Sequence, residues 1–251
     1  MTDWWSALYD DVLADMLLEG TSPEEVAATV RFLVDVLGLE PGARVFDQCA
    51  GIGRLAIPLA AWGAEVVAVE QAATYVRRAE ASARVAGVAL ELVTGDAFEF
   101  VPSRPCRGAL NWATSFGYRR DDAGNLRMLQ RALEALEPGG RFALDFLNVP
   151  GVLAGFRPCE IDRRGDVIML RESRLDLAAG LLHKVWTFIG SDGRRVERPS
   201  TVRLYTPDRL VALFGEVGFT DVQVFGGVDG RAIALDAPRC IVVGARPRGP
   251  R

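Results

Sequence analysis

The sequence predicts a doubly wound α/β fold around a mostly parallel sheet of seven strands, with an antiparallel last strand. Two observations carry this prediction. Between residues 41 and 146, short runs rich in valine, alanine and leucine alternate with helical segments. That alternation is typical of parallel strands joined by right-handed helical crossovers. After residue 150 it stops, and a β-rich insertion precedes one more helix and a closing strand pair.

The composition fits one such domain with a modest insertion. Of the 251 residues, 49% are hydrophobic, which is enough for a core, and the net charge is −4. The sequence has no basic stripe, which argues against nucleic acid as the main partner. It has no apolar run of membrane-spanning length and no basic, apolar leader at its start, so we expect a cytoplasmic protein without a membrane partner.

The four cysteines do not suggest a metal site. They are widely scattered and form no CxxC pair, so reduced thiols are the simplest interpretation. Asp121 and Asp122 are the one acidic pair near the predicted fourth strand. We discount them as magnesium ligands, because adjacent side chains point apart on a helix or strand.

Residues 1–40 are expected to form a helical cap. Apolar residues recur there at helical spacing, at Trp4, Trp5, Leu8, Val12 and Leu13. A second helix is predicted to start after Ser22, with Pro23 in its first turn and Glu25 completing a capping box.

The central segment, residues 41–149, is predicted to alternate strands and helices, and residues 204–251 to complete the same domain. The expected strands are residues 44–47, 65–70, 90–93, 109–112 and 141–146, with helices at 53–62, 74–86 and 123–136. A helix from Thr206 to about Gly218 and strands at 221–225 and 239–245 should close the sheet. Residues 150–203 should form an antiparallel β insertion, either a lid or an interface, with strands at 167–177, 181–189 and before Tyr205.

A glycine loop follows the first strand. Gly51 and Gly53 allow a tight turn and a close backbone approach to a ligand, and the next helix begins there. Gly51-x-Gly53-x-x-Ala56 also fits the dinucleotide-binding pattern, and Glu70 lies 19 residues after Gly51, where a ribose-binding acid would sit.

Asp47 separates the two interpretations of this loop. A dinucleotide would place a pyrophosphate there, and a neighbouring carboxylate would repel its charges. S-adenosylmethionine (SAM) would instead place a sulfonium and an amino group there, which a carboxylate favours. A simpler role for Asp47, as an acid that stabilises the loop, is compatible with either.

Three acids follow three successive strands. Because Asp47, Glu70 and Asp96 all lie at carboxyl ends, where this fold class binds ligands, they should share one edge of the sheet. Glu70 can accept hydrogen bonds from ribose hydroxyls, and Asp96 from an adenine amino group. Alone, each could be a solvent-facing strand tip or a helix cap.

On these residues the chain resembles the class I SAM-dependent methyltransferases. Asp47-x-x-x-Gly51-x-Gly53 resembles their first motif, Glu70 their ribose acid, and Asp96-Ala97 their adenine-binding pair. The resemblance covers residues 40–146 and the terminal strand pair. It implies a Rossmann-like fold, SAM as cofactor and S-adenosylhomocysteine (SAH) as product. The further cofactor contacts expected at these motifs are Ala50, Arg54 and Gln71.

The segment after the fourth strand resembles a bacterial subgroup known only as methyltransferase domain proteins. It reads NWATSFGY from residue 111 to 118, and Gln48-Cys49-Ala50 departs from the cysteine or glycine usual before the loop glycine. In similar enzymes, residues at the positions of Asn111 and Trp112 line the transfer site. The Asn-Pro-Pro-Tyr tetrapeptide of some base and amide N-methyltransferases is absent, which argues against those acceptors.

Three side chains are candidates for closing the site or for catalysis. Tyr9 resembles a tyrosine that closes over the methionine end of SAM, Tyr118 could orient the acceptor, and His183, the sole histidine, could act as a base. Ordinary packing for the two tyrosines and a solvent-facing position for His183 are the alternatives.

The sequence therefore predicts a SAM-dependent methyltransferase acting on an O, N or C atom of a small molecule. In-line transfer of an activated methyl needs mainly proximity and orientation, so no catalytic motif is required. The alternatives are a nicotinamide-dependent oxidoreductase and a non-catalytic SAM- or SAH-binding module. A homo-oligomer is possible, and no metal is expected.

Overall fold

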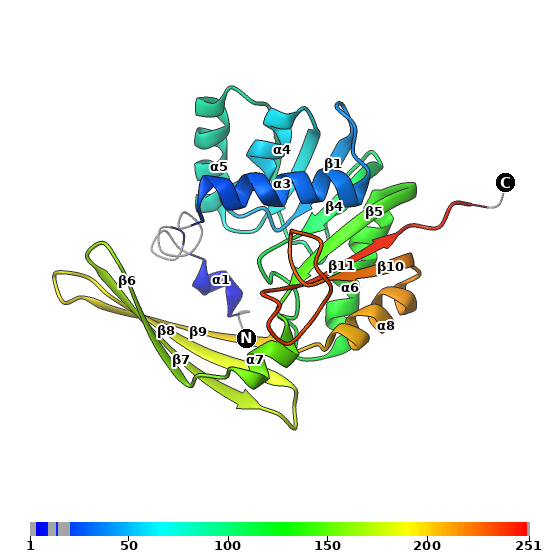
Figure 1. The fold of residues 1–251 in the computed structure, drawn as a ribbon. Helices are drawn as coiled ribbons and strands as arrows, with labels where there is room; N and C mark the ends of the chain where they lie inside the picture. The colour runs from blue at the N-terminus through cyan, green and yellow to red at the C-terminus, as the bar shows by residue number, and fades with distance from the viewer. Residues whose placement is uncertain (1–3, 10–13, 15–20, 250–251) are drawn as a thin grey trace.

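The chain folds around two separate sheets (Figure 1). The computed structural model describes residues 4–9, 14 and 21–249. The main sheet has seven strands in the order β10-β11-β5-β4-β1-β2-β3, and only β11 runs antiparallel to its neighbours. These strands are β1 (Arg44–Gln48), β2 (Glu65–Glu70), β3 (Glu91–Thr94), β4 (Cys106–Asn111), β5 (Leu136–Phe146), β10 (Thr220–Phe225) and β11 (Cys240–Ala245). The prediction of a doubly wound sheet with an antiparallel last strand is confirmed.

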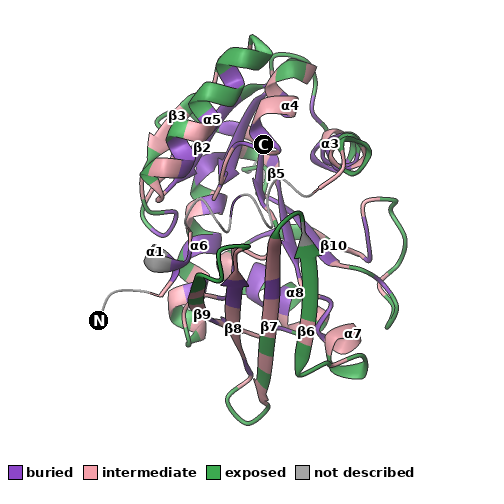
Figure 2. Cartoon of the chain, turned by 90° about the vertical axis from the view of Figure 1, so that its left-hand side faces the viewer, coloured by how far each residue is buried: buried purple, intermediate pink, exposed green. Residues whose placement is uncertain are grey.

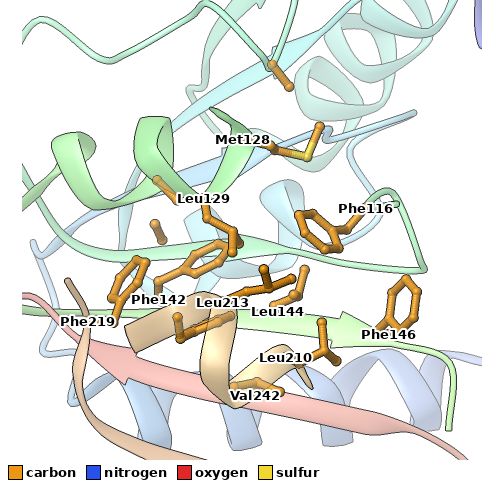
Figure 3. Packing of buried hydrophobic residues seen from close by; sticks show 14 of the residues in the cluster. Phe116, Met128, Leu129, Phe142, Leu144, Phe146, Leu210, Leu213, Phe219 and Val242 are labelled. Atoms are coloured by element: carbon orange, nitrogen blue, oxygen red, sulfur yellow. The ribbon is translucent and has the colours of Figure 1, made fainter. Parts of the chain in front are cut away.

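Helices cover both faces of the main sheet. Successive side chains of β1 point to opposite faces, so that Val45 packs with α3 and α4 while Phe46 packs with α6. The helices are α3 (Pro23–Leu37), α4 (Ala56–Trp62), α5 (Ala73–Ala86), α6 (Asp122–Ala135) and α8 (Pro207–Val217). Figure 3 shows Leu129 of α6 and Leu213 of α8 packed among phenylalanines of β5 and the following segments.

Local sequence sets the helix boundaries largely as predicted. The Ser22 hydroxyl accepts from the Glu25 amide at 3.2 Å, and the Glu25 carboxylate accepts from the Ser22 amide at 3.0 Å. This capping box starts α3, and Gly38 ends it in the left-handed conformation with φ +60°. By contrast, α4 begins at Ala56, three residues later than expected, because Gly51 and Gly53 turn the chain with positive φ before the helix can start.

Two further segments differ from the prediction. Strand β5 begins at Leu136, because Leu136 already pairs with Cys106 before the expected glycine turn. A short helix, α7 (Val149–Ala154), follows β5 and was not predicted.

The insertion is an antiparallel sheet of four strands in the order β6-β7-β8-β9. Its strands are β6 (Cys159–Arg164), β7 (Val167–Asp176), β8 (Leu181–Ile189) and β9 (Arg195–Arg203). Strand β6 was missed because its sequence, CEIDRR, has little β-forming pattern and lies at the sheet edge. Figure 2 shows β6 and β7 as largely exposed or half-buried, in contrast to the buried strands of the main sheet.

A short helix, α1 (Trp5–Leu8), packs on one face of this small sheet. Leu8 forms a cluster with Met169 of β7 and Phe188 of β8, and Trp4 and Tyr9 pack against both this cluster and the main core. The helix lies between the small sheet and the main domain (Figure 1). The predicted continuation through Val12 and Leu13 falls outside the described residues.

In the described part of the chain, no helix combines the length and apolar character needed to cross a bilayer. All four cysteines are free thiols, as the sequence predicted.

The main core should dominate stability. Leu129 is fully buried between sheet and helices, so Leu129→Ala should lower the free energy of unfolding by about 3 kcal/mol through lost burial and a residual cavity. Leu177, which is 72% exposed, is the matched control, and Leu177→Ala should change that free energy by less than about 0.5 kcal/mol. Urea denaturation monitored by tryptophan fluorescence measures both. Equal losses in the two variants would contradict this assignment of the core.

Candidate functional site

The carboxyl ends of the parallel strands meet above one edge of the main sheet. In sheet order this edge carries Asp96 after β3, Glu70 at the end of β2, Asp47 near the end of β1, Trp112 after β4, and Asp145 near the end of β5. Because β11 is antiparallel, Arg239 at its amino end reaches the same edge. A cavity of about 880 Å³, including the open solvent at its mouth, lies here.

The glycine loop forms the floor of this cavity. Cys49, Gly51 and Gly53 all have positive φ, at +79°, +58° and +82°. The amides of Cys49 and Ala50 both donate to the carbonyl of Val69, at 3.1 and 3.0 Å, which ties the loop to β2. Ala50, Gly51 and Arg54 line the cavity, so the loop backbone is exposed to a ligand.

Asp47 is a carboxyl group buried at the floor of the cavity. It is 3% exposed, and burial together with the negative charge of Glu70 raises its pKa to about 7, although Arg54 opposes the shift. Within the described residues, its carboxylate forms no hydrogen bond or ion pair. A cationic ligand group beside Asp47 would therefore stabilise its charged form.

Glu70 organises the loop and also faces the cavity. Its carboxylate accepts from the amide of Gly51 at 3.0 Å and from the amide of Ala72 at 2.8 Å. Burial raises the pKa of Glu70, and these backbone donors act in the opposite direction. The remaining lone pairs of the two oxygens can accept from ligand hydroxyls, as a ribose requires.

The third acid lies beside the adenine side of the predicted site. Asp96 accepts from the amide of Phe98 at 2.9 Å, so it caps the turn that follows β3. Asp96 and Ala97 line the cavity together with Gln71. Asp96 can therefore cap this turn and face a ligand in the cavity at the same time.

An ion pair that the sequence did not suggest holds the opposite side of the site. Asp145 is 2% exposed and accepts from Arg239 at 2.6 and 2.8 Å and from the amide of Ala113 at 2.9 Å. Arg239 also donates to the hydroxyl of Thr114 at 2.7 Å. Ala113 and Thr114 both have left-handed φ, near +60°, so this pair fixes a strained loop at the cavity wall. The sequence could have suggested Asp145 as a site residue, because this acid also lies near the end of a predicted strand.

Aromatic side chains cover the cavity from the side of α1. The hydroxyls of Tyr9 and Tyr118 hydrogen-bond to each other, and both rings line the cavity. Trp4 and Trp5 pack on Tyr118 with ring centroids 4.7 and 5.7 Å away. Burial raises the pKa of both tyrosines, so their hydroxyls remain protonated at neutral pH. The guanidinium of Arg119 lies 4.8 Å from the Trp5 ring centroid.

Three predicted site residues lie outside the cavity lining. Gly53 sits below the loop, where a Cβ atom would come within 3.2 Å of Ile57 and Ala79. Asn111 is fully buried and donates to the Gln48 side chain at 3.1 Å, so it supports the loop from behind. His183 lies on β8, hydrogen-bonded to Thr201 at 3.0 Å, and does not reach the cavity.

The residues present fit SAM better than a dinucleotide. Asp47, Glu70 and Asp96 form an acidic floor that disfavours a pyrophosphate and suits a cationic sulfonium and amino group. Arg54, which also lines the cavity, offers a partner for a carboxylate. Among the described side chains, no group of three or more histidines, cysteines or acids is arranged to hold a metal ion.

Comparison with known proteins places this site in a defined class. Residues 45–140 match the family model described as "Methyltransferase domain". This segment contains the glycine loop and all three acids, and it matches a methyltransferase domain. The methyltransferase resemblance stated from the sequence is confirmed for this segment.

Individual proteins show the breadth of the class. The ribosomal RNA small subunit methyltransferase B of Thermus thermophilus is 34% identical over 155 residues, which are 54% of this chain and 38% of that protein. The chain thus spans little more than a third of that relative. The CcbJ methyltransferase of Streptomyces caelestis superposes with a TM-score of 0.81 at 19% identity, over 96% of this chain and 98% of the other.

A third protein shares the fold with its cofactor bound. SAM-bound CalS10, an amino pentose methyltransferase of Micromonospora echinaspora, superposes with a TM-score of 0.65 at 18% identity. It covers 95% of this chain, and this chain covers 98% of it. At these identities both structural comparisons establish the fold of nearly the whole chain, including the small sheet.

The Asp145–Arg239 pair should be essential for the cavity wall. Arg239→Met would leave a buried carboxylate without its cation, so the free energy of unfolding should fall by about 3 kcal/mol. Arg231, whose ion pair with Asp229 is exposed, is the control, and Arg231→Met should leave the free energy of unfolding nearly unchanged. Urea denaturation at pH 7.5 measures both. A loss no larger in Arg239→Met than in the control would refute the structural role of the pair.

Proposed function

We propose that this chain is a SAM-dependent methyltransferase that acts on an O, N or C atom of a small molecule. The observation that carries the proposal is the aromatic cover of the cofactor cavity. Tyr9, Tyr118 and the neighbouring tryptophans cover the cavity on the side of α1, and a mostly apolar cavity with an aromatic wall suits a small acceptor. A polymer would need an open, shallow surface there.

The three strand-end acids would orient the cofactor along the sheet edge. Asp96 would bind the adenine amino group, Glu70 the ribose hydroxyls, and Asp47 would lie near the cationic methionine end. Arg54 is the candidate for the methionine carboxylate. This order points the reactive end toward Trp112 and Tyr118, where the aromatic cover meets the end of β4.

The cofactor supplies an activated methyl, so the protein's work is binding and orientation. Tyr118 and Tyr9 carry protonated hydroxyls and can donate a hydrogen bond that orients the acceptor. They also exclude water from the transfer site. His183 lies away from the cavity, so we assign it no role as a base. We propose that the small sheet, β6 to β9, acts as a lid, because its face packs on α1.

The rRNA methyltransferase relative raises the alternative of an RNA acceptor. That similarity covers 54% of this chain, and the net charge of −4 disfavours a polyanionic partner. The protein with a similar fold that is named an amino pentose methyltransferase matches nearly the whole chain. The match over nearly the whole chain favours a small-molecule acceptor over RNA.

The cofactor assignment can be tested by calorimetry with SAM, SAH and NADH. SAM and SAH should bind, and NADH should not. Glu70→Ala should weaken SAM binding roughly tenfold to a hundredfold, because ribose hydroxyls lose a charged acceptor and the loop loses its Gly51 anchor. Glu80→Ala, at an exposed position on α5, is the control and should leave binding unchanged. NADH binding, or equal SAM binding in both variants, would contradict the proposal.

A further inference from the structure

The face of the small sheet that packs on α1 carries an unusual group of side chains. Cross-strand pairing places Arg171 of β7 opposite Trp186 of β8, and Lys184 lies two residues before Trp186 on the same face. The Arg171 guanidinium lies 5.5 Å and the Lys184 ammonium 5.4 Å from the Trp186 ring centroid. The indole nitrogen of Trp186 donates to the Ser200 hydroxyl of β9 at 2.9 Å. Two cations therefore flank one anchored aromatic ring.

The positive charge in this group is not balanced. Arg171 forms an ion pair with Glu160 of β6, but its Nε atom is buried without an acceptor. Lys184 has no hydrogen-bond or ion-pair partner among the residues that the structure describes. Burial and the positive charges of Arg171 and Arg239 lower the pKa of Lys184 to about 8. A half-buried ammonium without a counter-ion is unfavourable, and an anion placed beside it would remove that penalty.

This group lies close behind the wall of the cofactor cavity, although none of its three residues lines the cavity itself. Tyr9 lines the cavity and also packs against the cluster of Leu8, Met169 and Phe188, against which Trp186 packs as well. Arg239, which is near enough to depress the pKa of Lys184, is bound to Asp145, and Asp145 holds the cavity-lining Ala113. The group therefore lies beyond the part of the cavity wall that Tyr9 and Ala113 form.

We propose that Lys184 and Arg171 form an anion-binding subsite beside Trp186, and that the methyl acceptor carries an oxyanion, a carboxylate or a phosphate, which docks there. The inference rests on the proposed methyltransferase function and names the class of its substrate. Trp186 would pack against the apolar body of the acceptor while the two cations hold its charge. Glu160 keeps Arg171 in place on the sheet and leaves Lys184 free for the anion.

Lys184 gives a direct spectroscopic test, because it is the only lysine in the chain. Protein labelled with ¹³C-lysine shows one side-chain Cε signal, and its chemical shift followed against pH gives the pKa of Lys184. The titration is run on the full chain saturated with SAH, alone and with benzoate, phenyl phosphate or the neutral analogue benzyl alcohol. Benzoate and phenyl phosphate distinguish the two kinds of oxyanion.

At least one of the two anions should raise the pKa of Lys184 by about one unit, because an opposite charge within a few ångströms favours the ammonium form. Benzyl alcohol should leave the pKa unchanged. The proposal is wrong if neither anion moves the pKa at high concentration. It is also wrong if benzyl alcohol moves it equally, because the effect would then come from packing alone.

A matched pair of variants tests the second cation. Arg171→Met should weaken binding of the effective anion roughly tenfold, whereas Arg174→Met, three residues along on the opposite face of β7, should not. Equal binding in the two variants would remove Arg171 from the subsite.

SAM titration of the same samples separates the two proposals. Protein that binds SAM but shows no effect of the anions on Lys184 refutes the subsite and leaves the methyltransferase function standing. Protein that binds no SAM refutes the proposed function, whatever the anions do.

Discussion

The architecture of the site depends on a carboxyl group that the fold buries without a cation of its own. Asp47 lies in an inner strand of the main sheet, with β2 on one side and β4 on the other, and only 3% of it is exposed. Its raised pKa reflects that burial and the nearby Glu70. A ligand that brings positive charge beside Asp47 offsets the cost of burying its carboxylate and the repulsion from Glu70. A ligand that brings phosphate there increases both costs. The glycine loop fits the sequence patterns of both SAM sites and dinucleotide sites. The buried carboxyl group of Asp47 favours SAM.

The surrounding structure keeps this arrangement rigid. The glycine loop is fixed by amide bonds to Val69 and by the Glu70 carboxylate, so the same acid that would bind ribose also shapes the loop. The opposite wall is fixed by Asp145 and Arg239, which hold Ala113 and Thr114 in left-handed conformations. Strained backbone at both walls, each held by a buried carboxylate, is typical of a preorganised binding site.

Much of this could be predicted from sequence, because it follows from local patterns. The strand and helix alternation, the Ser22 capping box and the acids Asp47, Glu70 and Asp96 are all visible as spacing. What could not be predicted depends on contacts between distant segments. The hydroxyl contact of Tyr9 with Tyr118 spans 109 residues, and the Asp145–Arg239 pair spans 94. Asn111 and His183 were assigned to the site by their position and type, but their side chains point elsewhere because the neighbouring Gln48 and Thr201 bind them.

The central claim is most directly tested by counting protons released when SAM binds. At pH 6.5 the Asp47 carboxyl, with a pKa of about 7, is mostly protonated in the cofactor-free protein, and a bound cation should lower that pKa and expel the proton. Calorimetry in buffers of different ionisation enthalpy gives the number of protons released, and the same measurement on Asp47→Asn gives the release from all other groups. The account predicts that the wild-type protein releases more protons than Asp47→Asn does, by roughly half a proton or more per SAM bound. Equal release by both proteins would contradict the role of Asp47 and, with it, the physical basis for SAM selection at this loop.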